Sequence, residues 1–125
     1  MSVILERADG AELKVNAWNW GVLHHVVAVA GLFPDEVWEP KRYNGGGDLD
    51  CQQVAALADW LETRILPRLS EGERMFFDST VTDVPDDGTL YRNESELWKN
   101  YSLHRTVLVS IIDFLRAAHG PVSFF

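Results

Sequence analysis

The sequence predicts an α+β fold, in which three helices pack with a small, mostly antiparallel sheet of short strands. Apolar residues recur at helical spacing in three segments, at about residues 17–32, 50–66 and 94–118. Short alternating stretches bounded by turn residues lie around these segments and begin with an N-terminal hairpin. No repeat, low-complexity tract or linker divides the 125 residues. We therefore expect a single globular domain, 1–125.

The N-terminal hairpin is predicted from its turn. Asp9-Gly10 is a turn dipeptide that favours tight hairpins, because glycine accepts the positive φ that such turns require. Residues on both sides of it alternate between apolar and polar side chains. The pattern predicts strands near residues 2–6 and 11–15.

The first helix is marked at both ends. Asn16 is a suitable N-cap, and Gly31 stands where a helix is expected to stop. Trp18, Val22 and Val26 recur at helical spacing between them, so they are expected on the core-facing stripe.

The second helix is predicted to start at Asp50, which together with Gln53 fits a capping box. Cys51 falls on the apolar stripe with Val54 and Ala58. We therefore expect this cysteine to be packed in the core, as free cysteines commonly are. The alternative is a reactive thiol, because the positive end of a helix dipole lowers a thiol pKa.

The third helix is predicted to be the longest. Asn93 and Glu96 suit its cap, apolar residues follow at helical spacing, and Gly120 lies near its expected end. Two further segments, "RMFFD" and "PVSFF", are expected to be extended, the second as a terminal strand.

Charge narrows the classes of function. Eleven basic residues against nineteen acidic ones give a net charge of −8. No basic stripe exists to neutralise phosphates, so nucleic-acid binding is not expected. No apolar run is long enough to span a bilayer, so no membrane association is expected. The single cysteine cannot form an internal disulfide, and the first residues do not read as a secretory signal. We expect a cytoplasmic protein.

The negative charge is concentrated in one segment. Between Ser70 and Glu96 there are eight acidic residues and two arginines, which accounts for six of the eight net negative charges. An acidic surface attracts basic partners. The residues proposed to bind such a partner combine this charge with nearby aromatic rings, and they are Asp83, Asp86, Asp87, Glu94, Trp98 and Tyr101.

The stretch "RYNGGGDLDCQQ" raises the question of a phosphate or ligand loop. A phosphate loop needs a lysine and a hydroxyl after its glycines, but aspartates stand there instead. The dinucleotide-binding glycine spacing is also missing. A small-ligand-binding protein or an enzyme with a pocket near residues 44–51 remains the alternative function, because loops that enter helices often carry function. Its candidate residues are Tyr43, Asn44, Asp48 and Cys51.

Metal sites and catalytic sets have little support. The loop from Asp83 to Glu94 matches part of the calcium-loop pattern, but Pro85 stands where a ligand oxygen is needed. A weak calcium site in loop 83–94 is therefore a third alternative. His24 and His25 are adjacent and diverge by about 100° on a helix, so they cannot bind one metal ion together. No catalytic residues, metal ligands or cofactors are predicted.

The tryptophan content bears on both core packing and binding. Five tryptophans are many for this length. We expect each to be a core residue first and an interface anchor second. Trp20 is predicted to lie off the main stripe of its helix, and Trp98 to lie beside the acidic loop.

The sequence as a whole predicts a small, acidic, non-enzymatic protein-interaction module with a basic protein partner. Its overall profile resembles that of bacterial immunity or inhibitor proteins, which neutralise basic toxins, or an adaptor. Homo-oligomer formation is left open, because any unpartnered apolar helix face can pair with a second copy.

Overall fold

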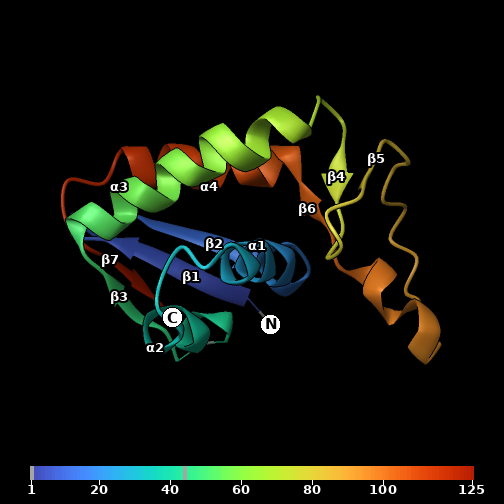
Figure 1. Cartoon of the computed structure of the whole chain (residues 1–125), viewed down its shortest axis with the longest axis horizontal. Coiled ribbons are helices and arrows are strands. Elements are labelled where there is room, and N and C mark those ends of the chain that lie inside the picture. Colours follow the sequence, from blue (N-terminus) through green and yellow to red (C-terminus); the bar gives the residue numbers. More distant parts are fainter. Residues whose placement is uncertain (1, 44) are drawn as a thin grey trace.

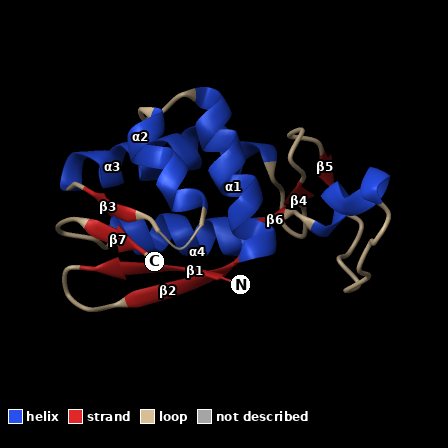
Figure 2. Cartoon of the chain, turned by 90° about the horizontal axis from the view of Figure 1, so that it is seen from below, coloured by secondary structure: helices blue, strands red, loops and turns tan. Residues whose placement is uncertain are grey.

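The computed structural model describes residues 2–43 and 45–125, and within them the fold is α+β, as predicted. A four-stranded antiparallel sheet has the order β2-β1-β7-β3. The helices lie on one face of this sheet, and its other face is open (Figures 1 and 2). The strands are β1 (Ser2–Arg7), β2 (Glu12–Asn16), β3 (Gly47–Leu49) and β7 (Val122–Phe124).

The N-terminal hairpin is confirmed. β1 and β2 pair with Val3 opposite Val15, which places both side chains on the covered face of the sheet. At the turn, the Asp9 carboxylate accepts a hydrogen bond from the Ala11 N–H at 2.9 Å. Gly10 has a φ of 88°, the positive value for which the turn selects glycine.

The first two predicted helices are confirmed together with their caps. α1 spans Ala17–Ala30, and its Asn16 cap accepts from the Asn19 N–H. α3 spans Cys51–Trp60, behind a capping box formed by Asp50 and Gln53. α3 continues into a π-helical turn, η2 (Leu61–Ile65), and a 3-10 turn, η3 (Leu66–Arg68). Between α1 and α3 lie α2 (Asp35–Trp38) and the 3-10 helix η1 (Glu39–Arg42).

The third predicted helix, 94–118, is not continuous. It is divided into a 3-10 helix, η4 (Glu94–Asn100), and α4 (Arg105–Arg116), with strand β6 (Leu103–His104) between them. β6 pairs with β4 (Arg74–Met75), and the backbone N–H of His104 donates to the Asn19 side chain at 2.8 Å. These long-range hydrogen bonds hold the chain extended where local helical spacing favours a helix.

Two predictions about side-chain burial are wrong. Trp18 is 44% exposed and Trp20 is buried, the reverse of the predicted stripe. The cause is that α1 is covered on two sides, so Trp20 reaches η1 and donates from Nε1 to the Lys41 carbonyl at 2.7 Å. Cys51 is exposed rather than packed. It occupies the first turn of α3, and the buried face of that helix begins only at Val54.

The hydrophobic core lies between the sheet and the helices. Leu5 and Val122 contribute to it from the sheet, and Leu57 and Leu108 contribute from the helices above. None of the described helices is long and apolar enough to cross a membrane.

One segment extends away from this core. Residues 76–102, here called the arm, leave the body after β4 and return to it at β6. The arm contains the short strand β5 (Val81–Thr82) and η4, and it projects beyond the end of the four-stranded sheet (Figures 1 and 2). Strands β5, β4 and β6 form a second, three-stranded sheet at its base.

Candidate functional site

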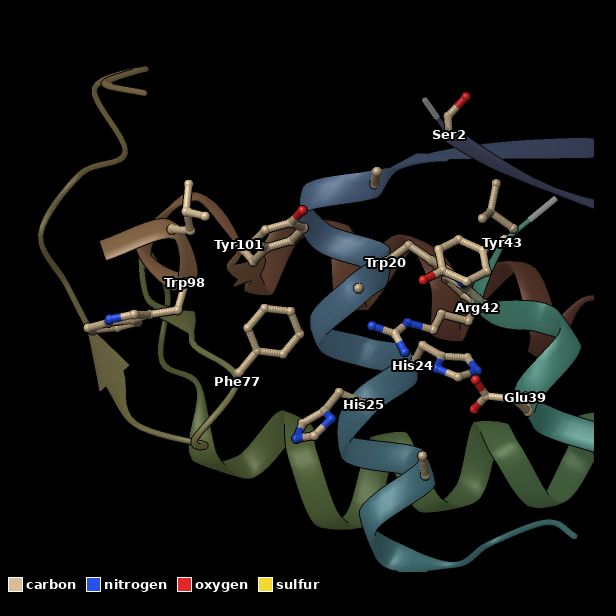
Figure 3. A pocket seen from close by; sticks show the side chains of 15 residues that line it. Ser2, Trp20, His24, His25, Glu39, Arg42, Tyr43, Phe77, Trp98 and Tyr101 are labelled. Atoms are coloured by element: carbon tan, nitrogen blue, oxygen red, sulfur yellow. The ribbon is translucent and has the colours of Figure 1, made fainter. Parts of the chain in front are cut away.

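A cleft of about 440 Å³ lies over one side of α1. As Figure 3 shows, α1 runs through the centre, with residues of the arm on one side and residues at and just after η1 on the other. Ligand pockets commonly have volumes from about 300 to about 1,000 Å³ and are lined mainly by apolar and aromatic side chains with a few polar groups. The residues that line this cleft include Gly21, His24, His25, Glu39, Arg42, Tyr43, Phe77 and Tyr101.

Gly21 forms the floor of the cleft where the arm approaches α1. A Cβ atom at this position would lie 3.3 Å from Cδ1 of Tyr101 and 3.6 Å from Cζ of Phe77. The missing side chain therefore lets both aromatic rings rest on the helix. A glycine in the middle of α1 costs helix stability, and here it provides this close approach.

The arm side of the cleft is a chain of packed aromatic rings. The ring centroids of Phe77 and Tyr101 are 5.1 Å apart, and Tyr101 meets Trp18 edge-on at 4.9 Å. Phe77 also meets the His25 ring edge-on at 5.4 Å. These spacings lie within the range at which aromatic pairs attract one another, so the wall is well packed.

The opposite side is fixed to α1 by buried hydrogen bonds. Trp38 donates from Nε1 to the His24 carbonyl at 2.9 Å, and His24 Nε2 lies 2.8 Å from the Trp38 carbonyl oxygen. The two rings are also stacked, with centroids 4.9 Å apart. Buried Lys41 donates from Nζ to the Val37 carbonyl at 2.7 Å, and burial lowers the pKa of its ammonium.

His24 is neutral in this setting. Burial lowers the pKa of its imidazole, more than the hydrogen bond to the Trp38 carbonyl raises it. Because a carbonyl oxygen only accepts, Nε2 carries the proton and Nδ1 carries a lone pair. Within the described residues, Nδ1 makes no hydrogen bond. Every fully buried side-chain nitrogen or oxygen among those residues does have a hydrogen-bond partner. Nδ1 is therefore not fully buried, and His24 is one of the residues that line the cleft.

Arg42 and Glu39 supply the charges of the cleft. Cζ of Arg42 lies 5.3 Å from the centroid of the Tyr43 ring, a cation–π contact. In the part of the chain that the structure describes, neither Arg42 nor Glu39 forms an ion pair or a side-chain hydrogen bond. In Figure 3, Glu39 lies on the side of α1 opposite to Phe77 and Tyr101, and the Arg42 side chain extends from that side to overlap α1.

The acidic residues lie on the arm beyond the cleft. Asp86 is 3.3 Å from Nε2 of His104, and the hydrogen bonds with Thr89 hold the pKa of Asp87 below its usual value. Asp83 and Glu94 are exposed, and their side chains have no hydrogen bond or ion pair within the described segments. Trp98 is 43% exposed, and its ring points away from α1 (Figure 3).

The cleft brings together residues from two of the sequence-based sets. Trp98 and Tyr101, proposed to bind a partner, line it together with Tyr43, proposed for a ligand pocket. Asp48 and Cys51 are exposed and are not among the residues that line it. Asn44 lies outside the described residues.

Metal binding gains no support from the loop at residues 83–94. Among the residues that the structure describes, no three His, Cys, Asp or Glu side chains form a group able to hold a metal ion. Asp86 and Asp87 instead accept hydrogen bonds from the backbone of Gly88 and Thr89, which closes a turn.

The sequence did not reveal the polar residues of the cleft. Arg42 and Glu39 stand in a segment without helical or strand pattern, and His24 resembled a helix-flank histidine. The only local signal is that Arg42 and Tyr43 directly precede the glycine-rich stretch. Gly21 carried a signal too, because a glycine inside an otherwise helical pattern often marks a close approach.

Comparisons with protein-family models, curated proteins and solved structures give no match for this chain.

Proposed function

We propose that this chain is a non-enzymatic interaction module that binds a basic protein through the outer surface of the arm. The observation that carries the proposal is Trp98, an exposed tryptophan held in a fixed position on an acidic surface. Tryptophan is the residue type that most often dominates binding energy at protein interfaces.

Trp98 is held in place before any partner arrives. Its ring meets Phe76 edge-on at 5.2 Å, and its Nε1 donates to the Ser95 carbonyl at 3.2 Å. A side chain already held in one conformation loses little entropy on binding, so more of its contact energy remains as affinity. Exposed Leu97 and Leu90 add apolar area on the same segment.

The charge around Trp98 sets the chemistry of the partner. Between Asp83 and Glu96 the arm carries five acidic residues and one arginine, and Lys99 is already paired with Glu96 at 3.1 Å. Such a surface attracts a basic partner and repels an acidic one. This long-range attraction mainly increases the rate of association.

The experiment is affinity capture from a lysate of the host at low ionic strength, followed by rate measurements with the purified partner. The test variants are Trp98→Ala and the double variant Asp83→Lys/Glu94→Lys. The two acidic residues are chosen because their side chains have no hydrogen bond or ion pair in the described structure. We expect capture of one basic protein, a loss of affinity of about ten-fold or more in Trp98→Ala, and slower association in the double variant.

The controls match each change. Trp18→Ala removes a tryptophan of nearly equal exposure, 44% against 43%. Glu12→Lys/Asp113→Lys changes net charge by the same amount on β2 and α4, away from the arm. Both controls are expected to keep the partner. Capture of nothing, or equal losses in test and control variants, contradicts the proposal.

A further inference from the structure

The cleft presents two opposite charges that do not neutralise each other. Side chains three residues apart in a 3-10 helix lie on the same side of it, so Glu39 and Arg42 of η1 point in a common direction. Both line the cleft, and they form no ion pair with each other within 4 Å. Both also act on His24 by charge, Glu39 raising and Arg42 lowering its pKa.

This polar end therefore offers a specific set of donors and acceptors. The Arg42 guanidinium is a planar donor that binds a carboxylate through two parallel hydrogen bonds. The Glu39 carboxylate accepts hydrogen bonds and favours a cation. The neutral His24 ring adds a second acceptor at Nδ1. A group that carries a carboxylate and an ammonium close together satisfies all three.

The other end of the cleft is aromatic. Phe77 and Tyr101 form its wall, and Gly21 leaves the helix surface flat beneath them. A flat ring gains more here than an aliphatic chain, because aromatic pairs add an attraction beyond the burial of apolar area. The volume of about 440 Å³ accommodates a small ligand rather than a folded segment.

We propose that the cleft binds a free aromatic α-amino acid, with its carboxylate on Arg42, its ammonium on Glu39 and its ring against Phe77 and Tyr101. This site adjoins the surface proposed for the basic protein but uses other side chains. The Trp98 ring points away from α1, whereas the rings of Phe77 and Tyr101 lie next to it (Figure 3). The chain would then carry a small-ligand site behind its protein-binding arm.

The test is calorimetric titration of the purified chain with L-tryptophan and L-phenylalanine. Two analogues each lack one charge: tryptamine has no carboxylate, and indole-3-propionate has no ammonium. L-leucine keeps both charges without a ring. We expect binding of at least one aromatic amino acid, and affinities lower by about ten-fold or more for the matching analogues and for L-leucine.

The variants assign each charge to a residue. Arg42→Gln should weaken amino-acid binding by about ten-fold or more and remove the preference over tryptamine. Glu39→Gln should remove the preference over indole-3-propionate. Arg64→Gln is the matched control, because Arg64 is exposed and does not line the cleft. Asp83→Lys/Glu94→Lys should bind the amino acid as the unmodified chain does, which separates this site from the arm surface.

Three results overturn the proposal. The first is the absence of heat and of any melting-temperature shift with every aromatic amino acid at millimolar concentration. The second is binding that Arg42→Gln and Glu39→Gln leave unchanged. The third is binding in which tryptamine or indole-3-propionate equals L-tryptophan. All three concern the chain alone, so they do not depend on finding its protein partner.

Discussion

At the scale of single residues, reciprocal contacts between His24 and Trp38 hold the cleft in shape. Each ring hydrogen-bonds the backbone carbonyl of the other residue, and the two rings stack. Removing one partner of a buried hydrogen bond costs about 1–3 kcal/mol, because the remaining polar group is buried without a hydrogen-bond partner from water or protein. The rigidity of this side of the cleft therefore depends on a histidine that stays neutral.

The neutral state of His24 makes stability depend on pH. Burial lowers the pKa of this imidazole below its ordinary value of 6.5. Below pH 6.5 the unfolded chain therefore binds a proton at this residue more readily than the folded chain does. The contribution of His24 to the free energy of unfolding should be complete above that pH and should decrease as the pH falls further.

Urea unfolding between about pH 8 and about pH 5 measures this effect. His24→Gln should flatten the decrease at low pH, whatever its effect on stability at neutral pH. His119→Gln is the matched control, because it removes a histidine that is exposed rather than buried. If His24→Gln keeps the slope of the unmodified chain, the histidine does not titrate in the way the structure implies.

At the scale of elements, the glycine-rich stretch passes very close to the backbone of β7. β3 pairs with β7, with Gly47 opposite Phe124. A Cβ atom on Gly46 would lie 2.8 Å from both the Cβ and the carbonyl oxygen of Phe124, too close without a shift of the strand. A Cβ atom on the neighbouring Gly45 would meet nothing within 4 Å.

Substitution of these two adjacent glycines should therefore affect stability to different extents. Gly46→Ala is expected to lower the free energy of unfolding by about 1–3 kcal/mol, the usual cost of overpacking. Gly45→Ala should change it by less than about 0.5 kcal/mol. Urea denaturation of the two variants measures both values. Equal effects would mean that the glycines serve flexibility rather than this close approach.

Sequence patterns located the elements whose signals are local. The caps at Asn16 and at Asp50 with Gln53, and the turn at Gly10, are found as predicted, because each depends on residues a few positions apart. The break between η4 and α4 was missed because it depends on β4 and on Asn19, which is 85 positions from His104 in the sequence.

The candidate site was predictable only by residue type. Trp98, Tyr101 and Tyr43 were singled out as aromatic residues near charge or near a loop, and all three line the cleft. The convergence of Glu39, Arg42 and His24 was not predictable. It requires η1 to pack on α1 through the bond from Trp20 to the Lys41 carbonyl, a contact 21 positions apart in the sequence.

At the scale of the whole molecule, the body and the arm have different compositions. No member of the buried hydrophobic core lies between residues 76 and 102, and most of the net negative charge lies in or near that segment. Only partly buried side chains of the arm, such as Phe77 and Tyr101, pack against the core. The body should therefore keep its stability largely without the arm.

Replacement of residues 78–100 by a short Gly-Ser turn tests this separation. The shortened chain keeps Phe77 and Tyr101 and loses Trp98 and the acidic loop. We expect cooperative unfolding in urea, because the core is intact, and no binding of the basic protein. The unmodified chain serves as reference for both measurements. Non-cooperative unfolding would show that the arm is required for the body to fold.

The pairing of β4 with β6 has a consequence for how such a chain can evolve. Arg74 lies opposite His104, and Met75 lies opposite Leu103, so the chain leaves the body and re-enters it at neighbouring positions. Insertions, deletions and exchanges between these two points leave the register of the four-stranded sheet unchanged. The arm can therefore change in sequence and length during evolution, and so acquire a new partner, while the fold of the body is retained.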